Sequence, residues 1–294
     1  MIRNPIPWPN GARCAVAFTF DMDGESLMHV GQPDSIADRP VGTSDLRYGP
    51  EIAVPRLVDL FAKYGMKQTF FVPGWCVNNY PATIEEILTG GHEIAHHGWI
   101  HGRLREMSDE AEAEDIAKGV EAIVSATGEK PRGFRAPSYA MSRRTMGFLQ
   151  DHGIGYEASL MGDDQPYLIE NDRGTMVELP SHMPLDDWTQ FVSFPDFGVR
   201  MQIKAASDAY AVHVEEFDAM WEHGGLWVSV WHPFVSGRLP RAMQIERLIR
   251  HMMEKGNVWF ARMDEIADHV NGLIARGEWT PRRHRFPLWE EAQR

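Results

Sequence analysis

The stretch Phe18-Thr19-Phe20-Asp21-Met22-Asp23-Gly24-Glu25 runs from apolar residues into two carboxylates one residue apart. A second stretch, His92-Glu93-Ile94-Ala95-His96-His97-Gly98-Trp99-Ile100-His101, passes from apolar to polar in the same way and offers two imidazoles four positions apart. One Asp and two His form the ligand set of an open catalytic metal site, which keeps room for water. The remaining Asp can act as a base beside that water. The rest of the chain is then the scaffold that brings the two stretches together.

The composition limits what the chain can do. Its 294 residues suit one large barrel or two ordinary domains, and 43% hydrophobic residues can fill a sizeable core. The formal net charge of -13 argues against nucleic acid or an anionic membrane as the main partner. The two cysteines, Cys14 and Cys76, form no disulfide framework, and each is expected to pack as a small hydrophobe.

No targeting segment is visible in the sequence. The N-terminus from Met1 to Pro9 has no apolar core typical of a signal peptide, and no segment approaches the length of a membrane span. We therefore expect a cytoplasmic protein that acts on a small molecule found inside the cell.

Apolar periodicity and turn residues predict strands that alternate with helices. The expected strands cover residues 14–20, 68–72, 92–96, 133–135, 154–159, 176–179, 226–231 and 258–261. The expected helices cover residues 54–61, 81–89, 108–127, 142–152, 207–223, 241–255 and 264–275. This alternation predicts an α/β fold with parallel pairing, either barrel-like or doubly wound. With no internal repeat and no linker, we expect a single domain over residues 1–294.

Three segments carry no clear periodicity. Residues 1–13 are rich in Pro and are expected to form an extended arm on the surface. Residues 24–50 read as a long loop, of the kind that often serves as a lid over a site. The tail over residues 278–294 is predicted either to lie on the surface or to wrap a neighbouring subunit.

Almost every candidate reactive side chain follows the end of a predicted strand. In a parallel barrel these ends open on one face, where barrel active sites lie. The residues concerned are Asp21, Asp23, His97, His101, Arg135 and His232. Taken separately, an Asp-x-Asp after a strand is often a turn device, and a His-x-x-x-His arises by chance among 13 His. Their joint placement at strand ends favours a metal site, with His92, His96 and His152 as structural groups.

At these residues the chain resembles the polysaccharide deacetylase superfamily of carbohydrate esterases, from Ala15 to about Ala275. The resemblance implies a deformed (β/α) barrel. The matching motifs are Phe20-Asp21-Met22-Asp23, His97 to His101, Arg135-Ala136-Pro137, Asp186-Asp187-Trp188 and Trp231-His232-Pro233.

The resemblance also implies roles for individual residues. It makes Asp21 the general base, Arg135 the group that orients this base, and His232 the general acid. The implied metal ligands are Asp23, His97 and His101. Mixed His and carboxylate ligands suit Zn²⁺ best, with Mn²⁺, Co²⁺ or Ni²⁺ as alternatives. The family resemblance further suggests a homo-oligomer, with a tetramer as one candidate.

Two departures from the secreted enzymes bear on the substrate. Those enzymes usually have adjacent Asp residues and a Ser or Thr after the first motif His, whereas here Met22 separates the pair and Gly98 follows His97. Together with the residues after Trp231, these features resemble the intracellular branch. That branch includes cyclic imide hydrolases, a metal-independent allantoinase group and peptidoglycan deacetylases, and the two His argue against the metal-independent variant.

Three functions follow as hypotheses. The first is metal-dependent ring opening of a cyclic imide to a half-amide, with the oxyanion held by the metal and a backbone N–H near Pro73-Gly74-Trp75. The second is N-deacetylation of an amino sugar or peptidoglycan fragment, and the third is an inactive binding protein on the same fold. An enclosed substrate pocket is expected to be lined by Trp75, Trp99, Trp188 and Pro137.

Overall fold

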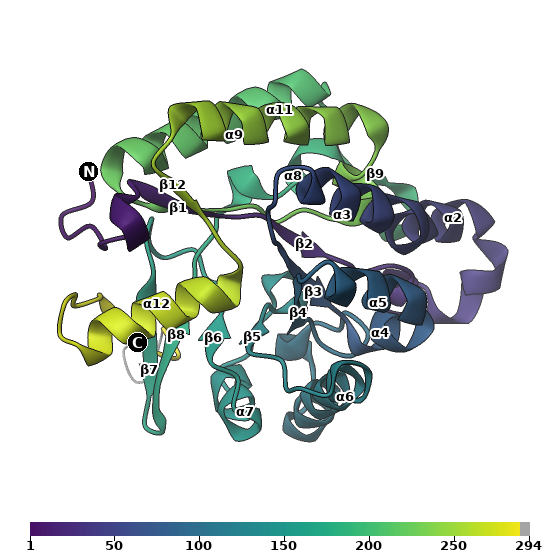
Figure 1. Ribbon diagram of the computed structural model, residues 1–294. Coiled ribbons are helices and arrows are strands. Elements are labelled where there is room, and N and C mark those ends of the chain that lie inside the picture. The colour runs from purple at the N-terminus through teal and green to yellow at the C-terminus, as the bar shows by residue number, and fades with distance from the viewer. Residues whose placement is uncertain (289–294) are drawn as a thin grey trace.

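The computed structural model describes residues 1–288, and two parallel sheets form its centre (Figure 1). The larger sheet has eight strands in the order β13-β7-β8-β6-β5-β4-β3-β2, and the smaller has three in the order β11-β1-β12. All pairs in these sheets are parallel except β7 with β8. The sheets meet where Phe20 of β2 bridges Trp231, beyond the end of β11. The result is the deformed (β/α) barrel expected from the sequence.

The strands are short and mostly buried. Their bounds are β1 Cys14–Ala17, β2 Thr19–Asp21, β3 Thr69–Val72, β4 Glu93–His96, β5 Gly133–Phe134, β6 Tyr156–Glu157, β7 Tyr167–Asn171, β8 Gly174–Glu178, β11 Leu226–Val228, β12 Val258–Phe260 and β13 Arg283–Arg285. A separate antiparallel pair consists of β9 Ser193–Phe194 and β10 Val199–Arg200.

Helices cover the outside of the sheets. Their bounds are α1 Ser26–Gly31, α2 Pro40–Tyr48, α3 Val54–Ala62, α4 Gly74–Asn79, α5 Pro81–Thr89, α6 Asp109–Thr127, α7 Thr145–His152, α8 Trp188–Phe191, α9 Ala206–His223, α10 Pro233–Ser236, α11 Leu239–Lys255 and α12 Met263–Ala275. Short 3-10 turns include η2 Pro33–Asp38, η6 Met183–Leu185 and η7 Pro195–Phe197. Figure 1 shows α9 and α11 side by side over the smaller sheet, where they contact β1, β11 and β12.

Local sequence explains where the long helices begin and end. At the start of α6, the Ser108 hydroxyl accepts the Ala111 N–H at 3.3 Å, and Asp109, Glu110 and Glu112 face the positive end of the helix dipole. Gly128 ends this helix in the left-handed conformation, at φ 77°. The expected boundaries of α6 are therefore confirmed.

The single strand predicted over residues 14–20 is wrong in one respect. It divides at Phe18 into β1 and β2, which belong to different sheets. The N–H of Thr19 donates to the Ser229 hydroxyl at 2.9 Å rather than to a strand carbonyl, and this interrupts the ladder. Phe18 then packs its ring against Phe61 and Trp227 and closes the core at the junction.

The segments without periodicity also differ from expectation. Residues 24–50 are largely helical, forming α1, η2 and α2, rather than a long loop. In the Pro-rich arm, Ile6 and Trp8 are buried against the barrel. The described part of the tail adds β13 to the edge of the larger sheet, beside β7 of the same chain. Residues 289–294 of the predicted tail lie outside the described residues. Cys14 and Cys76 are both free and buried, as predicted.

Candidate active site

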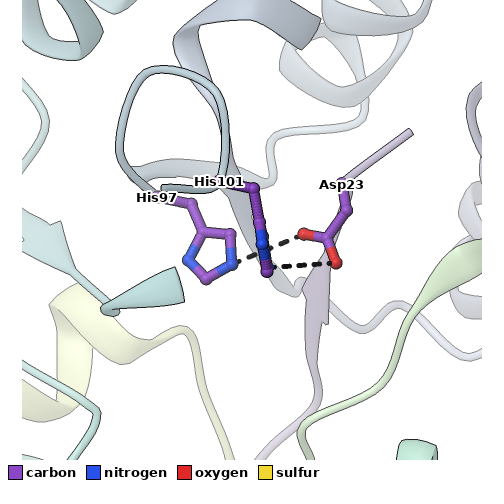
Figure 2. A group of neighbouring side chains, drawn as sticks. All are labelled: Asp23, His97 and His101. Carbon is purple, nitrogen blue, oxygen red and sulfur yellow. Dashed lines mark ion pairs between the residues drawn. The ribbon is translucent and has the colours of Figure 1, made fainter. Parts of the chain in front are cut away.

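Asp23, His97 and His101 meet at the carboxyl ends of β2 and β4. The Nε2 atom of His97 lies 3.4 Å from Asp23 Oδ1, and that of His101 lies 3.5 Å from Asp23 Oδ2. Figure 2 shows both rings directed at this carboxylate. All three residues are buried, and their ligand atoms lie within 4.8 Å of one another. The arrangement could hold one metal ion.

The hydrogen bonding of these residues fits a cation. Within residues 1–288, both Asp23 oxygens and His97 Nε2 are buried and have no hydrogen-bond partner, a costly state for polar atoms. His97 Nδ1 lies 2.7 Å from the carbonyl oxygen of Arg135 and can donate to it, which leaves the Nε2 lone pair for a metal. At 3.4 and 3.5 Å, the two imidazole nitrogens are too far from the Asp23 oxygens for strong hydrogen bonds, so these groups do not satisfy one another.

The charges of this cluster favour a bound cation. Burial alone would raise the pKa of Asp23, but His101, His97 and His232 lower it to about 2, so the carboxylate is ionised. Burial lowers the pKa of His101 to about 4, which leaves its ring neutral near pH 7. Burial also opposes the charge on His97, yet Asp21 and Asp23 raise the pKa of its ring. Metal binding must therefore displace any proton held at His97.

Asp21 lies next to this cluster and is held by Arg135. The guanidinium Nη1 of Arg135 donates to Asp21 Oδ1 at 2.5 Å and to Thr19 Oγ1 at 2.9 Å. Arg135 is fully buried, with its guanidinium carbon 4.0 Å from the ring centroid of Phe71. The second oxygen of Asp21 lies 3.9 Å from His97 Nε2. Asp21 thus has one oxygen fixed by Arg135 and one directed towards the cluster, as a base beside a metal site requires.

His232 lies on another side of the cluster and is held by Asp187. His232 Nδ1 is 2.7 Å from Asp187 Oδ1, and its Nε2 is 3.6 Å from Asp23 Oδ2. Burial opposes the charge on this ring, but Asp187 outweighs it and, with Asp23 and Asp186, raises the pKa of His232 to about 10. At neutral pH His232 is therefore protonated and can donate from Nε2.

Asp186, Asp187 and His232 also lie close enough together to be considered a second metal site. Their carboxylate oxygens already have partners, however. Asp187 Oδ2 accepts the N–H of His232 and the Ser236 hydroxyl, while Asp186 accepts the Trp188 N–H and the Tyr139 hydroxyl. This cluster is a hydrogen-bonded support for His232, in contrast to the bare oxygens of Asp23.

A cavity of about 860 Å³ opens over the site, and Asp21, His97, His101 and His232 line it. The expected pocket residues are only partly correct, because Trp188 lines the cavity and Trp75, Trp99 and Pro137 do not. Trp99 packs instead beside Gly74, Trp75 packs against His29 and Tyr80, and Pro137 packs near Gly98.

The backbone donors predicted near Pro73-Gly74-Trp75 are also wrong. The Gly74 N–H donates to Gly98 O at 3.0 Å and the Trp75 N–H to Trp99 O at 2.8 Å, so neither can hold an oxyanion. Sequence reasoning missed Tyr139, whose hydroxyl donates a hydrogen bond to Asp186, 47 positions away in the sequence. Its only signal was its place two residues after the Arg-x-Pro motif.

The described helices contain no segment long and apolar enough to cross a membrane. Comparisons with known proteins place the chain in one class, the deacetylase-type hydrolases. The sequence profile described as "Polysaccharide deacetylase" matches residues 45–156. A crystal structure of a Mycobacterium smegmatis protein assigned as a polysaccharide deacetylase is 38% identical, with a TM-score of 0.89, over 96% of this chain and 97% of that one.

Two further relatives support the assignment at different levels. The peptidoglycan deacetylase of Helicobacter pylori is 28% identical over 86% of this chain and 94% of its own length. The structure of PuuE allantoinase has a TM-score of 0.80 over 95% of this chain and 96% of its own, but at 21% identity it shows the fold alone. The chain belongs to the polysaccharide deacetylase family, whose members hydrolyse carbon–nitrogen bonds other than peptide bonds.

Proposed function

We propose that this chain is a metal-dependent N-deacetylase of a small N-acetylated substrate, such as an amino sugar or a peptidoglycan fragment. The observation that carries the proposal is the placement of a buried base and a buried acid on either side of Asp23, His97 and His101. The family and the Helicobacter pylori relative support this reaction over imide hydrolysis.

The residues around the cluster have three roles in hydrolysis: metal binding, proton acceptance and proton donation. A divalent ion held by Asp23, His97 and His101 would polarise the acyl carbonyl and lower the pKa of water. Asp21, fixed by Arg135, takes the proton of the attacking water on its free oxygen. His232 gives a proton from Nε2 to the departing nitrogen, and Asp187 keeps its ring oriented and charged.

The acid also bears on the choice of substrate. The amine released from an acetamide is strongly basic and must be protonated as it leaves, whereas an imide nitrogen leaves as a stabilised anion. A histidine with its pKa raised to about 10 suits the basic leaving group. The structure therefore favours the deacetylase hypothesis on chemical grounds as well.

Ring opening of a cyclic imide is the second candidate, and the wall of the cavity favours it. Segments around α1 and η7 meet there, because Gln32 Nε2 donates to Asp196 O at 2.9 Å and Arg39 pairs with Asp196. Gly31 lies against the Phe197 ring so closely that a Cβ would be 2.4 Å from it. A cavity walled in this way suits a small ring or a short fragment better than the middle of a polymer.

One experiment separates the two candidates. The zinc-loaded chain is incubated with N-acetylglucosamine, with short oligomers of it, and with succinimide, and release of acetate or opening of the ring is measured. We expect acetate release, and both Asp21→Asn and His232→Ala should abolish most of it. Turnover of succinimide alone, with His232→Ala less harmful than Asp21→Asn, would replace the deacetylase with the imidase. No turnover of any substrate would favour an inactive binding protein.

The identity of the ion, the cellular location, the oligomeric state and the domain organisation are further proposals. The ligand set of two imidazoles and one carboxylate supports Zn²⁺ over ions that prefer sites made only of oxygen ligands. The cytoplasmic location, the homo-oligomer and the single domain over residues 1–294 stay predictions. Cell fractionation, light scattering and limited proteolysis would test them.

A further inference from the structure

The loop that carries both histidine ligands has an unusual backbone. Gly98 lies at φ 71° and His101 at φ 60°, so two of its residues occupy the left-handed region. Glycine adopts this conformation freely, but a residue with a side chain pays a steric cost unless its surroundings hold it there. His101 is one of the three groups directed at the metal position, so whatever holds the loop also sets the direction of a ligand.

Asp115 holds this loop from the neighbouring helix α6. Its carboxylate is buried, and Oδ1 accepts the N–H of Trp99 at 2.9 Å. The backbone N–H of Ile100, the residue just before His101, also faces this carboxylate. One carboxylate therefore binds the Trp99 amide and faces the next amide, in the part of the loop between the two ligands.

The opposite side of the loop is held by α4. The carbonyl oxygens of Gly98 and Trp99 accept the N–H groups of Gly74 and Trp75 at 3.0 and 2.8 Å. The amides and carbonyls of one short segment are thus fixed from two helices. Asp115 is the side chain in this arrangement that can be changed without altering the backbone donors of α4.

Helix α6 packs directly against the loop, because glycines stand at the points of closest approach. A Cβ on Gly119 would lie 2.8 Å from Gly98 O and 2.2 Å from a ring carbon of His96. A Cβ on Gly98 would lie 3.0 Å from Asp115 Oδ1 and 3.1 Å from Pro137. No side chain fits between helix and loop at these points, so Asp115 can reach the loop amides.

We propose that Asp115 is a positioning residue that fixes His97 and His101 in the geometry needed to bind the metal. The proposal rests on the metal site of the proposed function and concerns how that site is built. Asp115 touches neither substrate nor ion, and its effect passes through the backbone of residues 98–101. Without it, the Trp99 amide loses its acceptor and the left-handed conformation at His101 loses its support.

The test measures metal affinity and does not depend on turnover. Zinc binding is followed by competition with a chromophoric chelator for the wild type and Asp115→Ala. Because groups that orient metal ligands usually contribute about 10- to 100-fold to affinity, we expect zinc Kd to rise by at least about tenfold in Asp115→Ala. The visible spectrum of the cobalt-substituted variant should also differ from that of the wild type.

Glu112 provides a matched control on the same helix. It is also a buried carboxylate of α6, but it accepts hydrogen bonds from Ser142 and Thr145 near the start of α7 instead of from the loop. Glu112→Ala should lower the thermal midpoint while leaving zinc Kd within twofold of the wild type. If Asp115→Ala does not fold, Asp115→Asn keeps one acceptor oxygen and should show a smaller rise in Kd.

The outcomes separate this proposal from the function on which it rests. A wild-type chain that binds no zinc overturns both. A wild type that binds zinc, with the Asp115 variants binding equally well, overturns only the role of Asp115. Equal weakening in Glu112→Ala would show that the effect is general destabilisation and would also overturn it.

Discussion

At the scale of single residues, hydrogen bonding decides which atoms are free to react. The Arg135 carbonyl occupies Nδ1 of His97, and Asp187 occupies Nδ1 of His232, so each ring presents Nε2 to Asp23. The motifs at strand ends were sufficient to predict which residues would meet. The sequence could not show that Asp187 supports His232, because the two lie 45 positions apart and are brought together in the fold, where Asp186 bridges Val230.

The aromatic residues show the limit of sequence reasoning at this scale. Trp75, Trp99 and Trp188 are equally plausible pocket residues from type and position alone. Only Trp188 lines the cavity, because it lies in α8 beside His232 while Trp99 is turned against Gly74. The direction of a side chain in a loop depends on tertiary contacts that local sequence does not specify.

The pair of Asp187 and His232 leads to a pH prediction. An acid must be protonated to act, so activity should fall as pH rises through the pKa of His232, which Asp187 keeps high. Asp187→Asn should lower kcat by about 100-fold or more and move the alkaline limb of the kcat/KM profile to lower pH. An alkaline limb at the same pH in both proteins would contradict the assigned role of Asp187.

At the scale of elements, regular patterns were predicted well and compact irregular ones poorly. The apolar stripe of α3 and the capped ends of α6 are local signals, and both helices lie where expected. Residues 24–50 contain Gly, Pro and Asp, which are typical of loops, so the sequence did not predict the short helices α1 and α2. Of the hairpin of β7 and β8, only β8 was predicted, as a strand over residues 176–179, and β7 was not.

These missed elements shape the cavity, and Arg39 tests their role. Arg39, at the start of α2, pairs with Asp196 of η7 and ties the two sides of the wall together. Because the pair is partly exposed, Arg39→Ala should cost less than about 1 kcal/mol of unfolding free energy. It should raise turnover of a long N-acetylated oligomer several-fold relative to a monomer.

A remote ion pair serves as the control for this prediction. Arg173→Ala breaks a pair with Asp151 far from the cavity and should leave substrate preference unchanged. If Arg39→Ala and Arg173→Ala give the same ratio of oligomer to monomer turnover, the wall does not select substrate size.

At the scale of the whole molecule, the barrel itself was predictable and its irregularities were not. Alternating strands and helices indicated a parallel α/β fold, and the structure has one. The division at Phe18 and the added strand β13 depend on contacts between residues far apart in sequence. The sequence also could not predict which polar groups would be buried between elements, and Glu93 is an example. It starts β4 and accepts hydrogen bonds from Thr69 of β3, Tyr156 of β6 and Asp264 of α12.

Glu93 should make the stability of the molecule depend on pH. Burial and the nearby charge of Asp264 raise the pKa of Glu93 from 4.5 to about 7. The folded protein thus binds a proton more tightly than the unfolded chain, so its contribution to stability is complete below pH 4.5 and is lost as pH rises to about 7. The loss should be about 3 kcal/mol.

Urea unfolding of the wild type and Glu93→Gln at several pH values measures this effect. The difference in unfolding free energy, wild type minus variant, should fall between pH 4.5 and 7 and stay level above it. Glu114→Gln, which changes an exposed carboxylate on α6, should give a difference that hardly varies with pH. A constant difference for Glu93→Gln would mean that Glu93 is ionised throughout.

Equilibrium dialysis against zinc, followed by elemental analysis, measures whether Asp23, His97 and His101 together bind one catalytic ion. We predict one zinc per chain in the wild type and in Asp21→Asn, which spares the three ligands, and little or none in Asp23→Asn or His97→Ala at the same free zinc concentration. Full zinc content in the Asp23 and His97 variants, or none in a folded wild type, would show that these three residues do not form a metal site.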